Sequence, residues 1–375
     1  MKIGIDARLY GIKHRGNGRY TQEVISHLEK IDHENKYFVF LRAEEMDSYQ
    51  PKNSNFQKVV ADFRAYSWQE QLLFPFLLNK YKLDLVHFMH FNVPLLYRRK
   101  FITTIHDLII THYPTSRASM LNPFLYKIKL FFYNIIISQA ASRAVRVITV
   151  SNFSKEDIIK TLKIKPEKIS VIYEGADLEK IDASDCERVI REIGIKNNFL
   201  LYVGAAYPHK NLEKLVLAFD LLLSERSDWQ LVLVGKDGYF YQQTKKFAQE
   251  NLNQENLSKI IFAGYLDDAK LSCLYQKAKL YVFPSLMEGF GLPPLEAQAS
   301  SLPIVSSNKS CLPEVLGDGA LYFDPEDATD IKDKIILASS DESLREQLIQ
   351  KGLANFQKFS WQKCAQEIIS VYSQK

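Results

Sequence analysis

The feature that most constrains the fold of this chain is a regular alternation between short apolar runs and longer amphipathic stretches. Nearly continuous runs of Val, Ile and Phe are typical of strands that are covered on both faces. In the first half these runs are 3–6, 37–41, 57–60, 85–88, 101–105, 145–150 and 169–173, and in the second half 199–203, 230–234, 260–263, 280–283, 303–306 and 320–323. Amphipathic stretches near 20–31, 68–82, 119–141 and 153–163 separate the first set. Two such series predict an α/β protein with two doubly wound parallel sheets.

The length of 375 residues also suits two domains rather than one. We expect the break near residues 174–177, because residues 178–197 are polar and lack strand character. The predicted parts are an N-terminal domain at 1–177, a C-terminal domain at 178–358 and a last helical segment at 359–375. Ligands of open α/β sheets bind outside the carboxyl ends of the strands, so a site is expected in a cleft between the two sheets.

Composition narrows the class of function. The net charge of +4 is mild and no helix or strand carries a dense basic stripe, which argues against a nucleic-acid partner. The four cysteines lie far apart and are predicted to be reduced, buried thiols in a reducing compartment. The N-terminal residues indicate a strand rather than a signal peptide, and no run of eighteen apolar residues occurs. These features favour a cytoplasmic location.

The strongest motif lies at residues 281–299, where a strand, a short loop and a helix start follow one another. The loop carries Glu288, and Gly291 lets the backbone come close to a ligand. The double proline that follows suits a first helical turn, whose free N–H groups favour an anion such as a diphosphate. Glu296 projects from the second turn toward the helix start, where it can accept hydrogen bonds from a ribose. The same nucleotide site is predicted to include Phe290 and Leu292.

Glu288 and Glu296, with seven residues between them, match the E-x7-E signature of retaining glycosyltransferases of the GT-B fold. The chain resembles glycosyltransferase family 4 in particular, over essentially its whole length. The resemblance implies two Rossmann-like domains, the first for the acceptor and the second for a nucleotide-sugar, with the last helix crossing back to the first. It also implies that Glu288 contacts the donor sugar and Glu296 the nucleotide ribose.

A second motif follows the first strand of the C-terminal domain. Lys210 stands beside a predicted helix start with Asn211 as its N-cap, where a bound anion would offset the repulsion between a cation and the helix dipole. The resemblance makes Lys210 a ligand of the diphosphate and places Gly204 and His209 in the same site, whereas a solvated lysine is the alternative. Relatives often carry an arginine after this glycine. This chain has alanines at 205–206, so His209 or Asn211 is expected to share that role.

Residues 15–20, Arg-Gly-Asn-Gly-Arg-Tyr, lie between the first strand and a helix and are expected to form a loop. The G-x-G pattern lacks the third glycine of a dinucleotide fingerprint, so the residues alone leave a flexible turn as an equal alternative. The resemblance implies that Gly16 and Gly18 close over the donor phosphates and the acceptor.

His106 and Asp107 follow the strand at 101–105, at the carboxyl edge of the first sheet. An adjacent His–Asp pair in that position favours a catalytic role. By the resemblance His106 contacts the donor sugar, and Asp107 is predicted to orient the acceptor hydroxyl. His87 and His90, around the end of an earlier strand, are expected to be packing residues rather than acceptor contacts.

A departing diphosphate gains negative charge and needs stabilisation by a metal ion or by fixed dipoles and cations. No D-x-D motif occurs in the chain, so no metal and no other cofactor is expected. The helix start at 291–294, Lys210 and the backbone of residues 16–18 are the predicted substitutes. The resemblance further implies retention of configuration, with the acceptor attacking on the face that the phosphate leaves. The G-x-G-R-Y, His-Asp-Leu and His-Lys-Asn-Leu motifs look like those of bacterial polysaccharide-assembly transferases, so GDP-mannose is the first candidate donor and a UDP-sugar the second.

The acceptor is expected to be a glycan or a lipid-linked glycan. Residues 116–138 mix lysines with many aromatic residues, and basic residues occur upstream at 98–100. Such a helix suits peripheral attachment to an anionic membrane surface, here the inner face of the membrane, but it also suits burial against the first sheet. Two other functions use the same architecture. A sugar-nucleotide epimerase would convert the donor without an acceptor, and a non-catalytic partner subunit would not turn it over.

Overall fold

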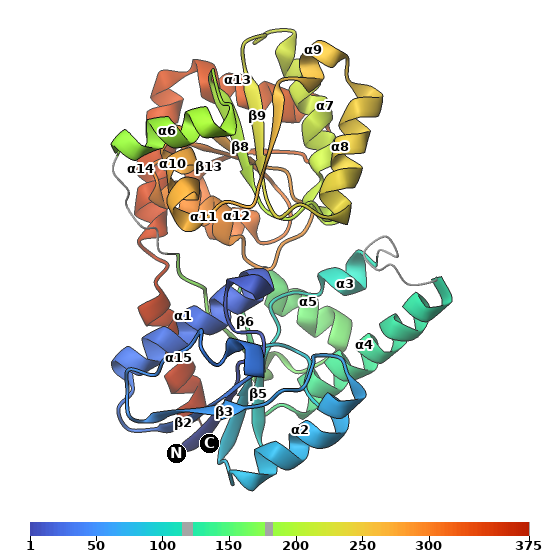
Figure 1. Ribbon diagram of the computed structural model, residues 1–375, viewed down its shortest axis with the longest axis vertical. Coiled ribbons are helices and arrows are strands. Elements are labelled where there is room, and N and C mark those ends of the chain that lie inside the picture. The colour runs from blue at the N-terminus through green and yellow to red at the C-terminus, as the bar shows by residue number, and fades with distance from the viewer. Residues whose placement is uncertain (115–122, 177–182, 375) are drawn as a thin grey trace. The chain divides into compact units, whose positions relative to one another are not determined.

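The computed structural model describes residues 1–114, 123–176 and 183–374 (Figure 1). Its internal contacts divide the chain into two compact units. Unit 1 comprises Met1–Gly175 together with Ser360–Lys375, and unit 2 comprises Ala176–Phe359. The two units are described separately below.

Unit 1 is built on a seven-stranded sheet in which every pair of neighbours is parallel. The strand order is β3-β2-β1-β4-β5-β6-β7, so the order reverses between β1 and β4. The strands are β1 Lys2–Asp6, β2 Lys36–Leu41, β3 Phe56–Val60, β4 Leu85–Phe88, β5 Phe101–Thr104, β6 Arg146–Thr149 and β7 Ile169–Val171. The buried side chains of β4 and β5 confirm that near-continuous apolar runs here are strands covered on both faces.

The helices of unit 1 connect these strands and supply its core. They are α1 Arg15–Ile31, α2 Trp68–Lys80, α3 Ile109–His112, α4 Pro123–Arg143, α5 Asn152–Leu162 and α15 Trp361–Ser373, with short 3-10 turns at Ile12–His14, Ala43–Glu45 and Pro166–Lys168. One hydrophobic cluster joins Phe74 and Leu78 of α2 with Tyr133 and Ile137 of α4 and with strand residues such as Val86. Helices α2 and α4 therefore cover the same side of the sheet.

The last helix, α15, belongs to unit 1 although it follows unit 2 in the sequence. It packs along α1, and its Trp361 is fully buried beside Tyr20. The backbone of Gly175 lies so close to Trp361 that an added Cβ would come within 2.2 Å of the Trp361 nitrogen. At the other end of α15, the Tyr372 hydroxyl lies 2.8 Å from Nδ1 of His87 in β4. The helix is thus anchored at both ends.

Unit 2 has a six-stranded parallel sheet with the order β10-β9-β8-β11-β12-β13, which reverses between β8 and β11. Its strands are β8 Phe199–Val203, β9 Gln230–Val234, β10 Ile260–Gly264, β11 Leu280–Phe283, β12 Ile304–Ser307 and β13 Ala320–Phe323. Its helices are α6 Ala183–Ile193, α7 Leu212–Leu223, α8 Tyr239–Asn251, α9 Gln254–Leu257, α10 Asp268–Lys277, α11 Leu292–Ala299, α12 Leu312–Leu316, α13 Ala328–Ser340 and α14 Glu342–Phe356, with 3-10 turns at Pro208–Lys210 and Gly317–Gly319. Every strand predicted from the sequence is present, and the predicted pair of doubly wound parallel sheets is confirmed.

Two local expectations are wrong. Cys186 of α6 and Cys273 of α10 form a disulfide, because these helices pack together and bring the two Cα atoms to 4.9 Å. A separation of 87 residues hid this pair in the sequence. The prediction of a buried free thiol holds for Cys311 and Cys364. In unit 1, α1 begins at Arg15 rather than near residue 20, so the glycines of the expected loop lie in the first helical turn.

The structure predicts an acid-sensitive unit 1. His87 is completely buried between Tyr372 and Thr104, and burial lowers its pKa to about 3 from an ordinary value of about 6.5. The folded chain therefore binds fewer protons than the unfolded chain between about pH 3 and about pH 6.5. Stability from this group is full above about pH 6.5 and is lost as the pH falls through that range.

We expect the unfolding temperature of unit 1, measured by calorimetry, to fall less between neutral and acid pH in the His87→Gln variant than in the unchanged protein. The exposed His33→Gln variant is the control, because its ring is already in solvent. An acid dependence that is the same in all three proteins would contradict this assignment.

Candidate functional site

The predicted site residues of unit 2 come from two loops that meet where the strand order of its sheet reverses. One loop follows β8 and carries Lys210, and the other follows β11 and carries Glu288. Because β8 and β11 are parallel neighbours, their carboxyl ends lie side by side. Loops that diverge at such a point leave room for a ligand between them.

Lys210 and Glu288 form an ion pair across this point. The Lys210 ammonium donates to both carboxylate oxygens of Glu288, at 2.6 and 2.7 Å. Both side chains are largely buried, with 17% and 8% of their surfaces exposed. The ammonium also lies 5.8 Å from the centre of the Phe283 ring, which favours a cation. The Lys210 ammonium has three N–H groups, and two of them are directed at Glu288. Among the contacts of the described residues, the third N–H group is left for a ligand.

The loop that carries Glu288 is fixed from the neighbouring strand. The Glu288 amide donates to the Ser310 hydroxyl at 3.1 Å. The buried Cys311 thiol donates to the backbone oxygens of Glu288 and Phe290, at 3.3 and 3.2 Å. The Phe290 ring is buried against Phe359. Cys311 therefore has a structural role, and burial raises its pKa, so it is not a reactive thiolate.

Helix α11 starts where the motif predicts. Gly291 is its N-cap with φ +99°, a left-handed conformation that favours glycine. An added Cβ there would also come within 3.2 Å of a Leu312 methyl group. Leu292 is the first helical residue, and the two prolines follow it. Since proline has no N–H, Leu292 supplies the only backbone donor among the first three helical residues, which makes this anion site smaller than a usual helix start.

Glu296 projects from α11 as predicted and is buried, with 3% of its surface exposed. The Tyr275 hydroxyl of α10 donates to its Oε2 at 3.1 Å and lies 3.2 Å from the Pro293 carbonyl oxygen. Tyr275 is itself fully buried, so it holds the carboxylate near the start of α11. Sequence reasoning missed this residue, because a tyrosine on a preceding helix carries no local signal of a partner 21 residues away.

The loop after β8 brings the other predicted residues to the same edge. The Gly204 carbonyl accepts a hydrogen bond from Tyr241, and the His209 carbonyl accepts one from Leu286 in the opposite loop. Burial, together with the Lys210 charge, lowers the pKa of His209 to about 4, so its ring is neutral at physiological pH. A neutral imidazole donates a hydrogen bond but does not replace the charge of an arginine.

Asn211 does not cap α7 as expected. It adopts a left-handed conformation with φ 61°, and its side chain makes no bond to the helix start. Its Nδ2 instead donates to the carbonyl oxygens of Pro284 and Pro325, at 3.2 and 2.7 Å. Asn211 thus ties together the loops that follow three strands. This use of its side chain makes it a poor candidate for the second diphosphate ligand.

The glycines of unit 1 lie at the start of α1, after β1. Gly18 packs against Gly11, and an added Cβ would lie 2.0 Å from the Gly11 carbonyl oxygen. Gly16 is exposed, with nothing within 4 Å of such a Cβ. Gly18 is therefore required for close packing rather than for flexibility. The 3-10 turn at Ile12–His14 leads directly into this first turn of α1.

His106 and Asp107 lie after β5, at the carboxyl edge of the unit 1 sheet. The two His106 ring nitrogens contact Glu174 Oε1 and the Met89 carbonyl oxygen, each at 3.3 Å, and the ring stands edge-on to Tyr20 at 4.6 Å. Glu174 is buried and was not singled out in the sequence. Asp107 Oδ1 accepts the Ile109 amide at 2.9 Å, which begins α3. The environment of His106 is therefore that of an oriented imidazole rather than a solvated one.

Comparison with known proteins adds an independent view of this arrangement. Residues 14–180 match the family model described as Glycosyltransferase Family 4, and residues 185–354 match Glycosyl transferases group 1. The chain is 29% identical to O-antigen chain mannosyltransferase B of Escherichia coli over 95% of each protein. Its fold matches sucrose-phosphate synthase from Thermosynechococcus elongatus, with a TM-score of 0.78 and 19% identity over 99% and 98% of the two chains. It also matches HepE from Anabaena in complex with UDP and glucose, with a TM-score of 0.76 and 18% identity over 100% and 99%.

The chain belongs to the GT-B glycosyltransferases. The predicted resemblance is thereby confirmed, as is the pair of Rossmann-like sheets. Glycosyltransferases of this fold use a nucleotide-sugar donor, and in this chain a helix start and a lysine occur together at the predicted donor site. The roles of the individual residues remain predictions, and the most direct one to test is that of Lys210.

We expect Lys210→Ala to lower the rate of glycosyl transfer by about 100-fold or more, as removal of one fixed group that stabilises developing charge does elsewhere. The substitution also leaves the buried Glu288 carboxylate unpaired, so Lys210→Gln, which retains a hydrogen-bond donor, separates loss of charge from loss of folding. Initial rates at saturating donor are the measurement, and Lys246→Ala, which removes an exposed lysine of unit 2, is the control. Near-normal turnover and donor affinity in Lys210→Ala would contradict the assignment.

Proposed function

We propose that this glycosyltransferase transfers a hexose, with retention of configuration and without a divalent metal, to a glycan or lipid-linked glycan acceptor in cell-surface polysaccharide assembly. The observation that carries the proposal is the Lys210–Glu288 pair beside the start of α11. A cation, a helix start and a buried carboxylate at the point of strand reversal match the needs of a diphosphate and a sugar. Glu296, held by Tyr275, is the proposed ligand of the nucleotide ribose.

In the proposed reaction the bond between the anomeric carbon and the diphosphate oxygen breaks, and a bond from the acceptor oxygen forms on the same face. The acceptor proton passes to the departing phosphate oxygen. Lys210, assisted by the Gly204 and His209 loop, stabilises the charge that grows on the diphosphate. Glu288 accepts hydrogen bonds from the sugar. The sequence contains no D-x-D motif, which supports stabilisation by fixed groups.

Unit 1 is assigned to the acceptor. We place Gly16 and Gly18 at the phosphates, because both lie in the first turn of α1, where the helix dipole favours an anion. His106 is the proposed contact of the donor sugar, since Glu174 and the Met89 carbonyl orient its ring. Asp107, which also holds the Ile109 amide at the start of α3, is the proposed contact of the acceptor hydroxyl.

GDP-mannose is the first candidate donor. The support is the similarity over 95% of the chain to an O-antigen mannosyltransferase of Escherichia coli. A UDP-sugar is the second candidate, since the fold also matches HepE, which was crystallised with UDP and glucose. The melting temperature of the protein, measured with each nucleotide-sugar at a saturating concentration, ranks the candidate donors. A ligand that binds only the folded state raises this temperature.

We expect transfer from GDP-mannose to a lipid-linked or free glycan to proceed equally well with and without EDTA. The product is expected to keep the α-configuration of the donor, which the anomeric couplings in its NMR spectrum report. A strict requirement for a divalent cation, or a β-linked product, would contradict the mechanism. Donor incubated without acceptor distinguishes the other functions, because an epimerase would convert the sugar and a non-catalytic subunit would leave both mixtures unchanged.

We further propose that unit 1 attaches peripherally to an anionic membrane surface. Of the segment predicted to do so, residues 116–122 lie outside the described residues, and the rest forms part of α4. The second half of α4 is buried in the core, but its first half exposes apolar side chains, and α2 exposes more on the same side of the sheet. They are Trp68, Leu72, Leu73 and Phe76 of α2 and Phe124, Leu125, Ile128, Phe131 and Phe132 of α4.

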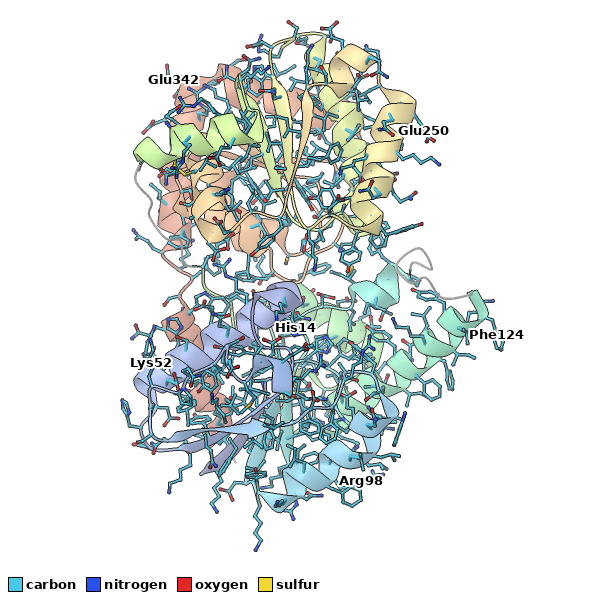
Figure 2. All side chains as sticks on the ribbon, viewed as in Figure 1. His14, Lys52, Arg98, Phe124, Glu250 and Glu342 are labelled. Atoms are coloured by element: carbon cyan, nitrogen blue, oxygen red, sulfur yellow. A yellow bond between two sulfur atoms is a disulfide. The ribbon has the colours of Figure 1, made fainter. Side chains whose placement is uncertain are left out.

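The charges around these side chains support the same surface. Lys127 and Lys129 are exposed among the aromatic residues of α4. The basic residues at 98–100 are also exposed, and Arg143 of α4 bonds to the Leu95 and Tyr97 carbonyl oxygens just before them. Figure 2 labels Phe124 at the N-terminal end of α4. Exposed apolar side chains with basic residues among them suit the boundary of an anionic bilayer. No helix among the described residues is long and apolar enough to cross a membrane.

We expect the protein to float with liposomes that contain an anionic lipid and to remain in the lower fraction with neutral liposomes. Replacement of Phe131 and Phe132 by serine removes apolar area and is expected to reduce flotation several-fold, with activity on a water-soluble acceptor retained. Leu337→Ser, at an exposed apolar residue of unit 2, is the control. Equal flotation of the α4 variant and the control would contradict the proposal.

A further inference from the structure

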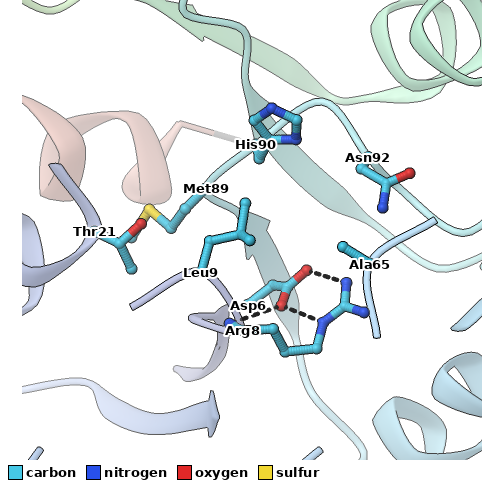
Figure 3. Close-up of a pocket in the computed structure, with 8 residues that line it drawn as sticks. All are labelled: Asp6, Arg8, Leu9, Thr21, Ala65, Met89, His90 and Asn92. Carbon is cyan, nitrogen blue, oxygen red and sulfur yellow. Dashed lines mark hydrogen bonds and ion pairs between the residues drawn. The ribbon is translucent and has the colours of Figure 1, made fainter. Parts of the chain in front are cut away.

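Unit 1 contains a second polar site at its own point of strand reversal, between β1 and β4. The strand order there is the same as around β8 and β11 in unit 2. Asp6 and Arg8 come from the end of β1, and His90 and Asn92 follow the end of β4. These residues line a small pocket together with Leu9, Thr21, Ala65 and Met89 (Figure 3). Of these residues only His90 has a role predicted from the sequence, that of a packing residue rather than an acceptor contact.

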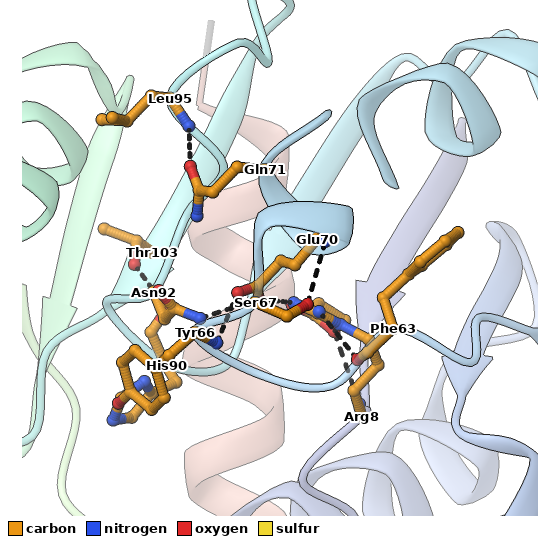
Figure 4. Close-up of polar contacts among 11 residues, drawn as sticks. Arg8, Phe63, Tyr66, Ser67, Glu70, Gln71, His90, Asn92, Leu95 and Thr103 are labelled. Carbon is orange, nitrogen blue, oxygen red and sulfur yellow. Dashed lines mark hydrogen bonds and ion pairs between the residues drawn. The ribbon is translucent and has the colours of Figure 1, made fainter. Parts of the chain in front are cut away.

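The floor of the pocket is a buried charge network. Arg8 pairs with Asp6 and with Glu70 of α2, each at 2.7 Å, and its guanidinium lies over the Phe74 ring. Glu70 has no exposed surface and also accepts the Tyr66 amide and the Asn92 side chain, both at 2.7 Å (Figure 4). Two carboxylates and one guanidinium give the network a formal charge of −1. Burial raises the pKa of the Glu70 carboxyl, although the Arg8 charge and the Asn92 hydrogen bond act in the opposite direction. The network therefore offers no net positive charge to an anionic ligand, whether Glu70 is ionised or protonated.

Two buried polar atoms beside this network have no hydrogen-bond partner among the described residues. They are Asn92 Oδ1 and His90 Nδ1. The orientation of the Asn92 amide is fixed, because its other end donates to a carboxylate that can only accept. Burial lowers the pKa of His90 to about 3, so its ring is neutral and does not offset the negative charge. An unpaired buried polar atom costs about 1–3 kcal/mol, which favours a ligand that fills both positions.

We infer that this pocket binds one hydroxyl group of a neutral sugar, as a subsite for the acceptor of the proposed transfer reaction. The cavity of about 20 Å³ has room for a single water-sized group, so the rest of the sugar lies outside it. A sugar hydroxyl donates to Asn92 Oδ1 and exchanges a second hydrogen bond with His90 Nδ1. Tyr66, an exposed side chain whose ring centre lies 6.5 Å from that of His90, supplies apolar surface for the face of the sugar. Since the network has no net positive charge, it disfavours a phosphate or carboxylate at this position. Binding of a neutral sugar does not depend on the proposed function. Only the identification of that sugar as the acceptor rests on it.

Two variants test the subsite without breaking the charge network. Ala65→Leu places bulk at the pocket and leaves every ionised group in place. His90→Phe retains the ring contacts with Phe91 and removes the unpaired nitrogen. Both are expected to raise the KM for the acceptor about tenfold, as loss of one hydrogen bond to a buried group does, with the donor KM and kcat unchanged within about twofold. Ala43→Leu, at an exposed alanine of the same unit, is the matched control.

A readout besides turnover separates failure of the subsite from failure of the proposed function. Saturation-transfer NMR with methyl α-mannoside and with mannose 6-phosphate measures binding in the absence of any donor. Signal from the neutral glycoside alone, reduced in Ala65→Leu and unchanged in Ala43→Leu, supports the subsite even if no transfer reaction is found. Equal binding of the phosphorylated sugar, or neutral binding that neither variant changes, overturns it. No binding with an unchanged acceptor KM also overturns it and indicates a pocket that holds only water.

Discussion

The reversal of strand order within each parallel sheet is the constraint on which the rest of this structure depends. Crossover connections on the two sides of the reversal point run in opposite directions, so the loops after β1 and β4, and after β8 and β11, diverge from a common edge. A ligand site needs room and several convergent polar groups, and a sheet provides both only there. Each unit uses this position for ionised side chains that it holds largely out of water.

The two reversal points carry opposite electrostatic character. In unit 2, Lys210 neutralises Glu288. The start of α11 and the remaining Lys210 N–H group then suit an anion. In unit 1, Arg8 is paired with two carboxylates and leaves no net positive charge, and the buried atoms without a partner suit a hydroxyl group. A diphosphate and a neutral sugar are the two chemical parts of a transfer reaction. The charges of the two sites thus differ in the same way as the charges of the two reactants in the proposed function.

Most of the fold could be predicted because parallel strands leave a strong sequence signal. The run 85–88 is entirely apolar apart from His87, and it is β4 as predicted. The start of α11 was also predictable, since Gly291 and two prolines are local determinants of a helix N-terminus. What failed depends on contacts between distant residues. The Cys186–Cys273 disulfide, the partner of Tyr275 and the bonds of Asn211 to two strand-end carbonyls have no local signature. The reversal-point pocket of unit 1 was missed for the same reason. His90 was predicted to be a packing residue, because the sequence does not show that Asp6 and Arg8 lie beside it in the folded sheet.

The place of α15 in unit 1 has a consequence for the order in which the protein is made. Residues 176–359 are synthesised before α15, so unit 2 has its whole sequence while unit 1 still lacks a helix. Until Trp361 and Tyr372 are added, the apolar face of α1 and the buried His87 have no cover. Synthesis of unit 1 thus begins before that of unit 2 and is completed after it, and unit 1 is the part that a chaperone would need to protect.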